Sequence, residues 1–239
     1  MAESRHKTEL FLAVGTGDLS KVKSIVDFDI SLLAEREKGR GPIMAATESG
    51  KKDVADFLAV KALYALRRRL IPKKKIGIVI HDLGEGHVTQ AVGDIAKFLR
   101  DEDRALRYEA VNTLAFHLDS KAHRPEFERM LFEDADEDVR MVAARGLGYV
   151  LRRTRNYRAA RLLLKKLHDS GDDGYVRLSA YEALQMIWLP EADAKRAWRR
   201  WHVWPMYELS RHMSSEDELQ WKVDWAFVES VQQQVEYVP

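Results

Sequence analysis

Three stretches of the chain repeat one pattern: DRALRYEAVNTLA at residues 103–115, DEDVRMVAARGLG at 136–148 and DGYVRLSAYEALQ at 173–185. Each begins with Asp, has Arg four residues later, Ala three residues after the Arg and Leu four residues after the Ala. The copies are offset by 33 and 37 residues. A period of this length indicates a helical-repeat protein, in which each repeat buries its apolar face against its neighbours.

Each shared position has a physical reason if the three stretches are helices. The Asp caps the first turn, and its charge complements the helix dipole. The Arg one turn later pairs with this Asp or with that of the next repeat, and the small Ala lets two helices cross closely. The residues expected to build the common core are Leu106, Leu114, Val139, Leu147, Val176 and Leu184.

These stretches resemble the inner helix of the HEAT repeat. The resemblance covers about residues 88–190 and implies that each inner helix is paired with an outer one. The expected outer helices are residues 89–100, 125–132 and 155–168.

A second period of 33 residues lies nearer the N-terminus, where TELFLAVGTG at 8–17 aligns with GPIMAATESG at 41–50. Gly17 and Gly50 fall where a helix ends in a left-handed turn, a conformation that glycine adopts freely. The motif GPIMAA resembles the Thr-Pro-Leu-His-x-Ala signature of the ankyrin repeat, with Gly41 where Thr is usual and Met44 where His is usual. The resemblance implies a pair of ankyrin-like repeats.

The two periods predict an all-α helical-repeat solenoid, an ankyrin-like pair followed by a HEAT-like α-α superhelix. Its expected parts are ankyrin-like repeats at 1–66, a basic linker and loop at 67–87, HEAT-like repeats at 88–213 and a C-terminal capping helix at 214–239. Within the linker, the apolar run 76–80 fits either a short strand or an extended segment packed on both modules. In the capping helix, Ser215 and Glu218 are expected to form a capping box.

Composition narrows the classes of function. The formal net charge is +1, so no global field points to nucleic acid or membrane. The chain has no cysteine, which excludes disulfides and thiolate chemistry and favours a reducing, cytoplasmic setting. No apolar run approaches the about 20 residues that a membrane helix needs, and the N-terminus lacks the apolar stretch of a signal peptide.

The segment HDLGEGH at 81–87 is the strongest candidate for chemistry. His81, Asp82, Glu85 and His87 are possible ligands of a divalent metal or acid–base groups, and the two glycines would let the loop fold back. An ordinary polar surface loop is the competing interpretation. No His-Glu-x-x-His pattern or nucleophile motif occurs, so we assign no catalytic residue, cofactor or metal ligand and expect no enzyme.

Basic residues cluster in two places. Residues 67–75 hold six cations in nine positions, and a second group lies on the third outer helix and its approach. That second group comprises Arg152, Arg153, Arg155, Arg158, Arg161, Lys165 and Lys166, followed by Arg196, Arg199 and Arg200. Acidic residues gather instead at turns, which predicts an acidic edge and a basic outer stripe. Solvated helix faces, an acidic protein partner and nucleic acid phosphates all remain open as explanations.

Side chains that differ between the repeats are candidates for binding a partner. On the inner helices these are Glu109, Asn112, Thr113, Arg145, Tyr181 and Gln185. Trp198, Arg199 and Trp201 belong to a Trp-rich stretch, because Trp and Arg are frequent in interface hot spots. Packing of the tryptophans against the capping helix is the alternative for that stretch.

The pattern as a whole favours a non-enzymatic protein–protein interaction module. Small ankyrin-like and HEAT-like proteins often serve as adaptors, and in bacteria some are immunity proteins that block a cognate toxin. The expected partner is therefore another protein, such as a toxin or effector. A nucleic-acid-binding protein that uses the basic stripe and a metal-dependent enzyme that uses residues 81–87 are the alternatives.

Overall fold

A computed structural model describes residues 2–190, 193 and 214–236 of the chain. Within these residues the regular structure is helical and no strand forms, apart from one isolated bridge between Glu37 and Arg40. The predicted all-α class is confirmed. The chain divides into two compact units, residues 1–118 and 119–239, and each is described by itself. None of the described helices has the length and apolar character to cross a membrane.

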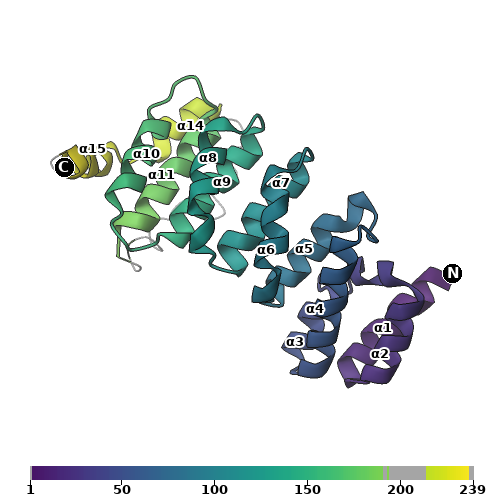
Figure 1. The fold of residues 1–239 in the computed structure, drawn as a ribbon. Helices are drawn as coiled ribbons and strands as arrows, with labels where there is room; N and C mark the ends of the chain where they lie inside the picture. Colours follow the sequence, from purple (N-terminus) through teal and green to yellow (C-terminus); the bar gives the residue numbers. More distant parts are fainter. Residues whose placement is uncertain (1, 191–192, 194–213, 237–239) are drawn as a thin grey trace. The chain divides into compact units, whose positions relative to one another are not determined.

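The first unit is a series of short helices, shown in purple to teal in Figure 1. Its α-helices are α1 (Ala2–Thr16), α2 (Leu19–Phe28), α3 (Pro42–Glu48), α4 (Lys52–Arg67), α5 (Ile76–Glu85), α6 (Val92–Ile95) and α7 (Arg104–Asn112). Shorter turns of helix are η1 (Ile30–Ala34), η2 (Lys73–Lys75), η3 (Thr89–Ala91), η4 (Ala96–Arg100) and the π-helical η5 (Thr113–His117). Helix α1 packs on α2, and α3 packs on α4.

The apolar residues of the first period form the core of these two helix pairs. Leu10, Ala13 and Val14 of α1 are buried, as are Ile43 and Ala46 of α3. Pro42 stands in the first turn of α3, where its missing N–H is not needed. The glycines that end α1 and α3 are left-handed as predicted, with φ of 79° at Gly17 and 66° at Gly50.

Residues 76–85 form helix α5, so the expectations of a strand, an extended linker and a loop there are wrong. Ile76, Val79, Ile80 and Leu83 recur at the three- and four-residue spacing of one helix face, and the last three are buried. Gly84 also lets α5 approach its neighbours closely, because a Cβ there would overlap the Thr113 side chain. The apolar run was too short for its period to reveal a helix on its own.

Asp82 joins α5 to the N-terminus of α3. Its carboxylate is fully buried and accepts hydrogen bonds from the backbone N–H groups of Ile43 at 2.9 Å and Met44 at 3.0 Å. The N-cap of α3 is Gly41, which has no side chain to accept those hydrogen bonds. A Cβ on Gly41 would overlap the Asp82 carboxylate. The ankyrin resemblance leads one to expect Thr at position 41. Glycine at this position instead makes room for a cap that another helix supplies.

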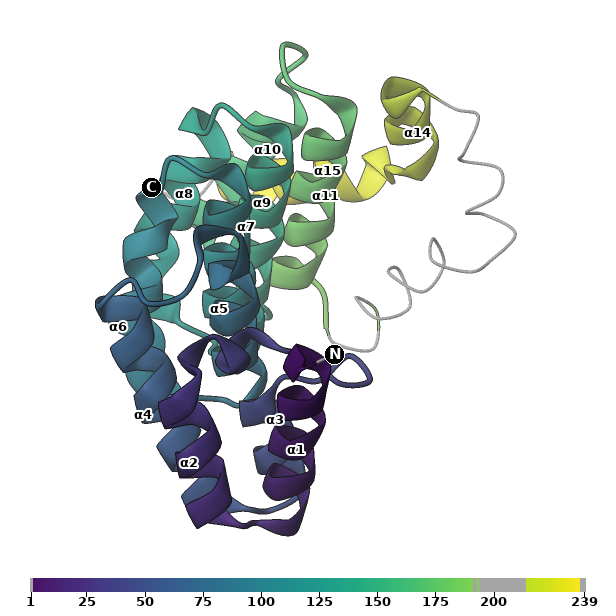
Figure 2. The ribbon, with the colours of Figure 1, turned by 90° about the vertical axis from the view of Figure 1, so that its right-hand side faces the viewer.

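The second unit is also built of α-helices, shown in teal to yellow in Figures 1 and 2. They are the short turn η6 (Lys121–His123) and the α-helices α8 (Arg124–Glu133), α9 (Glu137–Val150), α10 (Tyr157–Leu167), α11 (Gly174–Trp188), α14 (Ser215–Lys222) and α15 (Trp225–Glu236). Helix α9 packs on α8 and α11, and α10 packs on α11.

The repeated pattern takes the same local structure in each copy. Asp103, Asp136 and Asp173 are the N-caps of α7, α9 and α11, and each side chain accepts a backbone N–H of the first turn. The repeated alanines and leucines are fully buried. The predicted caps and core positions are therefore confirmed.

In the first two copies the repeated Arg bonds to the turn before its own helix. Arg107 donates from Nη1 to the carbonyls of Asp101 and Glu102, both at 3.0 Å. Arg140 donates in the same way to the carbonyl of Asp134 at 2.8 Å, and it also pairs with Asp172. Asp172 precedes the cap Asp173 by one residue, so Arg140 reaches the turn that begins the next copy.

The C-terminal segment differs from its prediction in two ways. It forms two helices, α14 and α15, rather than one capping helix. The N-cap of α14 is Ser214, whose side chain accepts the N–H of Asp217, so the proposed box of Ser215 and Glu218 is one residue out of register. Val228 and Val231 are buried as expected.

Replacement of Asp82 tests the cap that α5 gives to α3. Asp82→Ala should lower the free energy of unfolding of the first unit by about 1–3 kcal/mol, because two buried N–H groups lose their acceptor. Chemical denaturation followed by circular dichroism measures this loss. The exposed cap Asp18 of α2 offers a comparison, since Asp18→Ala should cost about 1 kcal/mol or less.

The same residue gives a pH dependence of known sign. Burial raises the pKa of Asp82 to about 6 from the ordinary 3.8, although the two backbone N–H groups oppose this rise. The folded state therefore binds the carboxyl proton of Asp82 more tightly than the unfolded state does. The stabilisation that this proton gives is fully present below pH 3.8 and is lost as the pH rises through about 6. Between pH 5 and 7 the stability difference between the native chain and Asp82→Asn should change by about 1 kcal/mol. A constant difference would contradict the raised pKa.

Gly148 tests the close contact between α9 and α11. A Cβ at Gly148 would overlap the backbone of Ala183, so Gly148→Ala should destabilise the second unit by about 1–3 kcal/mol. Gly15, within α1, has no atom near its Cβ direction, and Gly15→Ala should stabilise the first unit by about 0.5–1 kcal/mol. Hydrogen exchange of the α9, α11 and α1 amides assigns each effect to its unit.

Candidate binding surface

The basic segment predicted at 67–75 forms the end of α4, the turn η2 and the residues between them, and it borders a cleft of about 750 Å³ in the first unit. We call this the basic cleft. The cations that line it are Arg67, Arg69, Lys73, Lys97 and Arg100. The acidic residues that line it are Asp94, Asp101 and Glu102. The cleft thus carries an excess of positive charge on a surface of mixed sign.

One carboxylate holds two of these cations in place. Arg67 donates from Nε and Nη2 to Oδ2 of Asp94 at 2.9 and 2.8 Å, and Lys97 donates to Oδ1 at 2.8 Å. The hydrogen bond from Arg67 is the main reason that the pKa of Asp94 lies below its usual range, and burial opposes this effect. Arg67, Lys97 and Asp94 therefore form an internally paired charged corner of the cleft.

Other cations of the segment have no such partner. Arg69, Lys73 and Lys74 are exposed, and none of them forms an ion pair with a described residue. Lys75 differs, because it donates to Glu35 at 2.8 Å. Exposed cations that form no ion pair with a described residue can bind an anionic ligand without breaking such a pair.

The backbone of Arg69 is unusual. Its φ is 54°, in the left-handed region, which costs a residue with a Cβ roughly 1 kcal/mol compared with glycine. The N–H of Arg69 bonds to the carbonyl of Leu66 at 3.2 Å, and the N–H of Leu70 bonds to that of Ala65 at 2.9 Å. These two bonds form the Schellman motif, whose left-handed position is usually glycine.

Exposed apolar side chains lie on the same helix and turn. Val60 and Tyr64 of α4 are 66% and 50% exposed, and Leu70 is 44% exposed. The Arg68 guanidinium lies 6.0 Å from the centre of the Tyr64 ring. Tyr beside Arg is a combination that protein interfaces favour.

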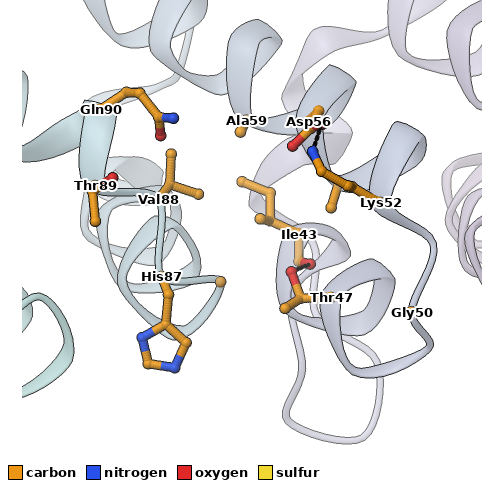
Figure 3. Close-up of a pocket in the computed structure, with 12 residues that line it drawn as sticks. Ile43, Thr47, Gly50, Lys52, Asp56, Ala59, His87, Val88, Thr89 and Gln90 are labelled. Carbon is orange, nitrogen blue, oxygen red and sulfur yellow. Dashed lines mark hydrogen bonds and ion pairs between the residues drawn. The ribbon is translucent and has the colours of Figure 1, made fainter.

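A second cleft in the first unit, of about 310 Å³, is shown in Figure 3. We call it the polar cleft. Val88, Thr89 and Gln90 lie on one side, and the ion pair between Lys52 and Asp56 lies on the other. The lysine of this cleft is thus already paired, which distinguishes it from the basic cleft.

The residues at 81–87 serve the fold rather than one common site. Asp82 caps α3, and Glu85 is paired with Arg36. His81 lies between two carboxylates, with Nδ1 2.8 Å from Glu109 and Nε2 3.3 Å from Glu85. His87 is exposed, and its Nδ1 lies 3.2 Å from the carbonyl oxygen of His117. Among the described residues no group of three or more His, Asp or Glu has an arrangement that could hold a metal ion.

The expected exposure of several inner-helix residues is wrong. Thr113 is fully buried and donates to Glu109 at 3.1 Å. Tyr181 and Gln185 are buried because the C-terminal helices cover α11, and the Tyr181 hydroxyl accepts bonds from Gln185 at 2.7 Å and from the N–H of Asp224 at 3.1 Å. Sequence periodicity placed these residues on the right helices but did not reveal what packs over them.

The remaining inner-helix candidates are partly exposed. The Glu109 carboxylate forms hydrogen bonds with His81 and Thr113, and it accepts one from Asn112 at 3.4 Å. Arg145 pairs with Glu182 at 3.0 Å. Their role in binding a partner stays a prediction. Trp198, Arg199 and Trp201, together with Arg196 and Arg200, lie outside the described residues.

The predicted basic stripe of the second unit is largely occupied by internal contacts. Arg152 pairs with Asp119 and Arg158 with Glu128, both at 3.0 Å. Lys166 is buried and pairs with Asp172 at 2.7 Å, and Arg161 donates to the carbonyl of Val235 at 2.7 Å. The stripe therefore offers less free charge than its sequence indicates.

Sequence reasoning missed two parts of the basic cleft. Lys97 and Arg100 were read only as part of an outer helix, although Asp94, Lys97 and Arg100 recur every three residues. That spacing was a usable signal for one charged face. The left-handed backbone of Arg69 had no signal, because glycine marks such positions in sequence and Arg does not.

The contact between His81 and Glu109 gives a test of this geometry. The hydrogen bond with Glu109 raises the pKa of His81 above its ordinary value, against the effect of burial. Glu109→Gln should lower that pKa, which NMR titration of the imidazole ring measures. Glu102→Gln should leave it unchanged, and an unchanged pKa in Glu109→Gln would contradict the contact.

Comparison of the chain with protein-family models, with curated proteins and with solved structures finds no match.

Proposed function

We propose that this chain is a non-enzymatic binding protein whose basic cleft receives an acidic surface of a protein partner. The observation that carries the proposal is the set of exposed cations Arg69, Lys73 and Lys74, which form no ion pair with a described residue. Some cations elsewhere, such as Arg140 and Lys166, are bound to carboxylates, whereas these three lie together on one short segment. Unpaired positive charge beside a cleft accelerates and orients the approach of an acidic partner.

The mixed charge of the cleft favours a protein over a nucleic acid. Asp94, Asp101 and Glu102 line it together with the cations, and they would repel the closely spaced phosphates of a polynucleotide. A protein surface can place its own basic residues opposite these carboxylates. Exposed Tyr64 and Leu70 next to the cations supply the apolar contact typical of protein interfaces.

The repeated sequence pattern supports the wider role. We propose that the ankyrin-like and HEAT-like repeats form a scaffold, and that the chain acts as an adaptor or immunity protein for a toxin or effector. The histidine and acidic residues at 81–87 have structural partners, which favours binding over metal-dependent catalysis.

Charge reversal at the cleft tests the proposal. The double variant Arg69→Glu/Lys73→Glu should lose the dominant protein that the tagged native chain captures from its own lysate after nuclease treatment. Quantitative mass spectrometry measures that loss. The control Arg155→Glu/Lys165→Glu reverses two cations of the second unit that form no ion pair with a described residue, and it should retain the partner.

Two outcomes would oppose the proposal. Equal capture by both variants would show that the partner binds elsewhere. Capture that disappears with nuclease, together with tight binding of a fluorescent single-stranded oligonucleotide by the native chain, would replace the protein partner with nucleic acid.

A further inference from the structure

Three other helix ends of the first unit have the same turn as Arg69 and can be compared with it. The same pair of backbone bonds ends α1 at Gly17, α3 at Gly50, α4 at Arg69 and α5 at His87. In each turn the left-handed residue donates to the carbonyl three residues before it, and the next residue donates to the carbonyl five residues before it. The four φ values are 79°, 66°, 54° and 54° in that order. Glycine therefore serves this turn in the same unit, and Arg69 stands where glycine would be less strained.

Among the described residues, no side-chain contact accounts for arginine at this turn. His87 has a local partner, because its Nδ1 lies 3.2 Å from the His117 carbonyl oxygen. Asp119, which is also left-handed, pairs with Arg152. The Arg69 side chain instead lines the basic cleft and forms no ion pair with a described residue. Residues in such backbone conformations cluster at functional sites, and Arg69 combines this conformation with a place in the basic cleft.

We propose that Arg69 is a partner-binding residue that is retained at the expense of stability, and that with Lys73 it receives carboxylates of an acidic protein segment. This inference rests on the proposed function and names the residue that anchors it. The left-handed backbone fixes the direction in which the side chain leaves the end of α4. Arg67 and Lys97 of the same cleft are already paired with Asp94, so they are less available to a ligand than Arg69 is. A guanidinium binds a carboxylate through two parallel hydrogen bonds, which a lysine at the same position does not reproduce.

The test separates stability from binding in a single substitution. Arg69→Gly should raise the melting temperature by about 2–4 °C. It should also weaken binding of a fluorescein-labelled Asp- and Glu-rich peptide containing Leu and Phe by roughly tenfold, as one charge-assisted contact is lost. Arg69→Lys keeps the charge and the strain, so its melting temperature should stay the same and its affinity should fall less. Differential scanning calorimetry and fluorescence anisotropy give the two readouts.

Lys38→Gly is the matched control. Lys38 is also left-handed, with φ of 50°, and it is an exposed cation that does not line the basic cleft. Its replacement should raise the melting temperature without changing the peptide affinity. Loss of affinity in Lys38→Gly equal to that in Arg69→Gly would mean that net charge alone is measured, and it would overturn the inference.

The remaining outcomes distinguish this inference from the proposed function. Arg69→Gly could bind the peptide as well as the native chain does while Lys73→Glu weakens binding. This result would support the basic cleft as the binding surface and refute the proposed role of Arg69. If neither substitution changes the affinity, the proposed function and the role of Arg69 are both refuted. If Arg69→Gly lowers the melting temperature, arginine serves the fold at this turn and the trade of stability for binding is refuted.

Discussion

The buried carboxylate of Asp82 is the contact on which the arrangement of the first unit depends. Its two hydrogen bonds to the start of α3 make α5 a structural partner of the N-terminal helices rather than a linker after them. An ionised group in the interior is tolerated because the N–H groups and the positive end of a helix surround it. Gly41 completes the arrangement, since any larger residue there would displace the carboxylate. Because α5 is held in this way, the residues from Arg67 to Lys75 must turn between two fixed helices. This turn produces one wall of the basic cleft.

Much of the helical framework could be predicted from particular residues. The repeated Asp, Ala and Leu located the caps and cores of α7, α9 and α11, and Gly17 and Gly50 located two helix ends. These features depend on neighbours a few residues away, which the order of the sequence reveals. Helix α5 was missed because its run of apolar residues is short and interrupted by glycines. The N-cap of α14 was placed one residue late, since Ser214 and Ser215 are both plausible caps.

The candidate site was harder to predict because it depends on contacts between distant residues. The sequence identified the cations of 67–75 but could not show that Lys75 binds Glu35 while Arg69 forms no ion pair with a described residue. It likewise overestimated the free charge of the second unit, where the partners of Arg152 and Arg158 lie 33 and 30 residues away. Tyr181 and Gln185 were expected at the surface, but helices more than thirty residues further along the chain cover them. A count of charges in sequence therefore gives an upper limit on the charge that a folded surface offers.

The left-handed turn at Arg69 also has an evolutionary consequence. Every arginine codon is a single base change from a glycine codon, so the less strained residue is always within reach of mutation. Stabilising substitutions of this kind are easy to reach and are neutral unless function opposes them. A lineage that lost the partner would be free to replace arginine at this turn, whereas a lineage that kept it would not. The residue at position 69 in related chains would then record which of them still bind the partner.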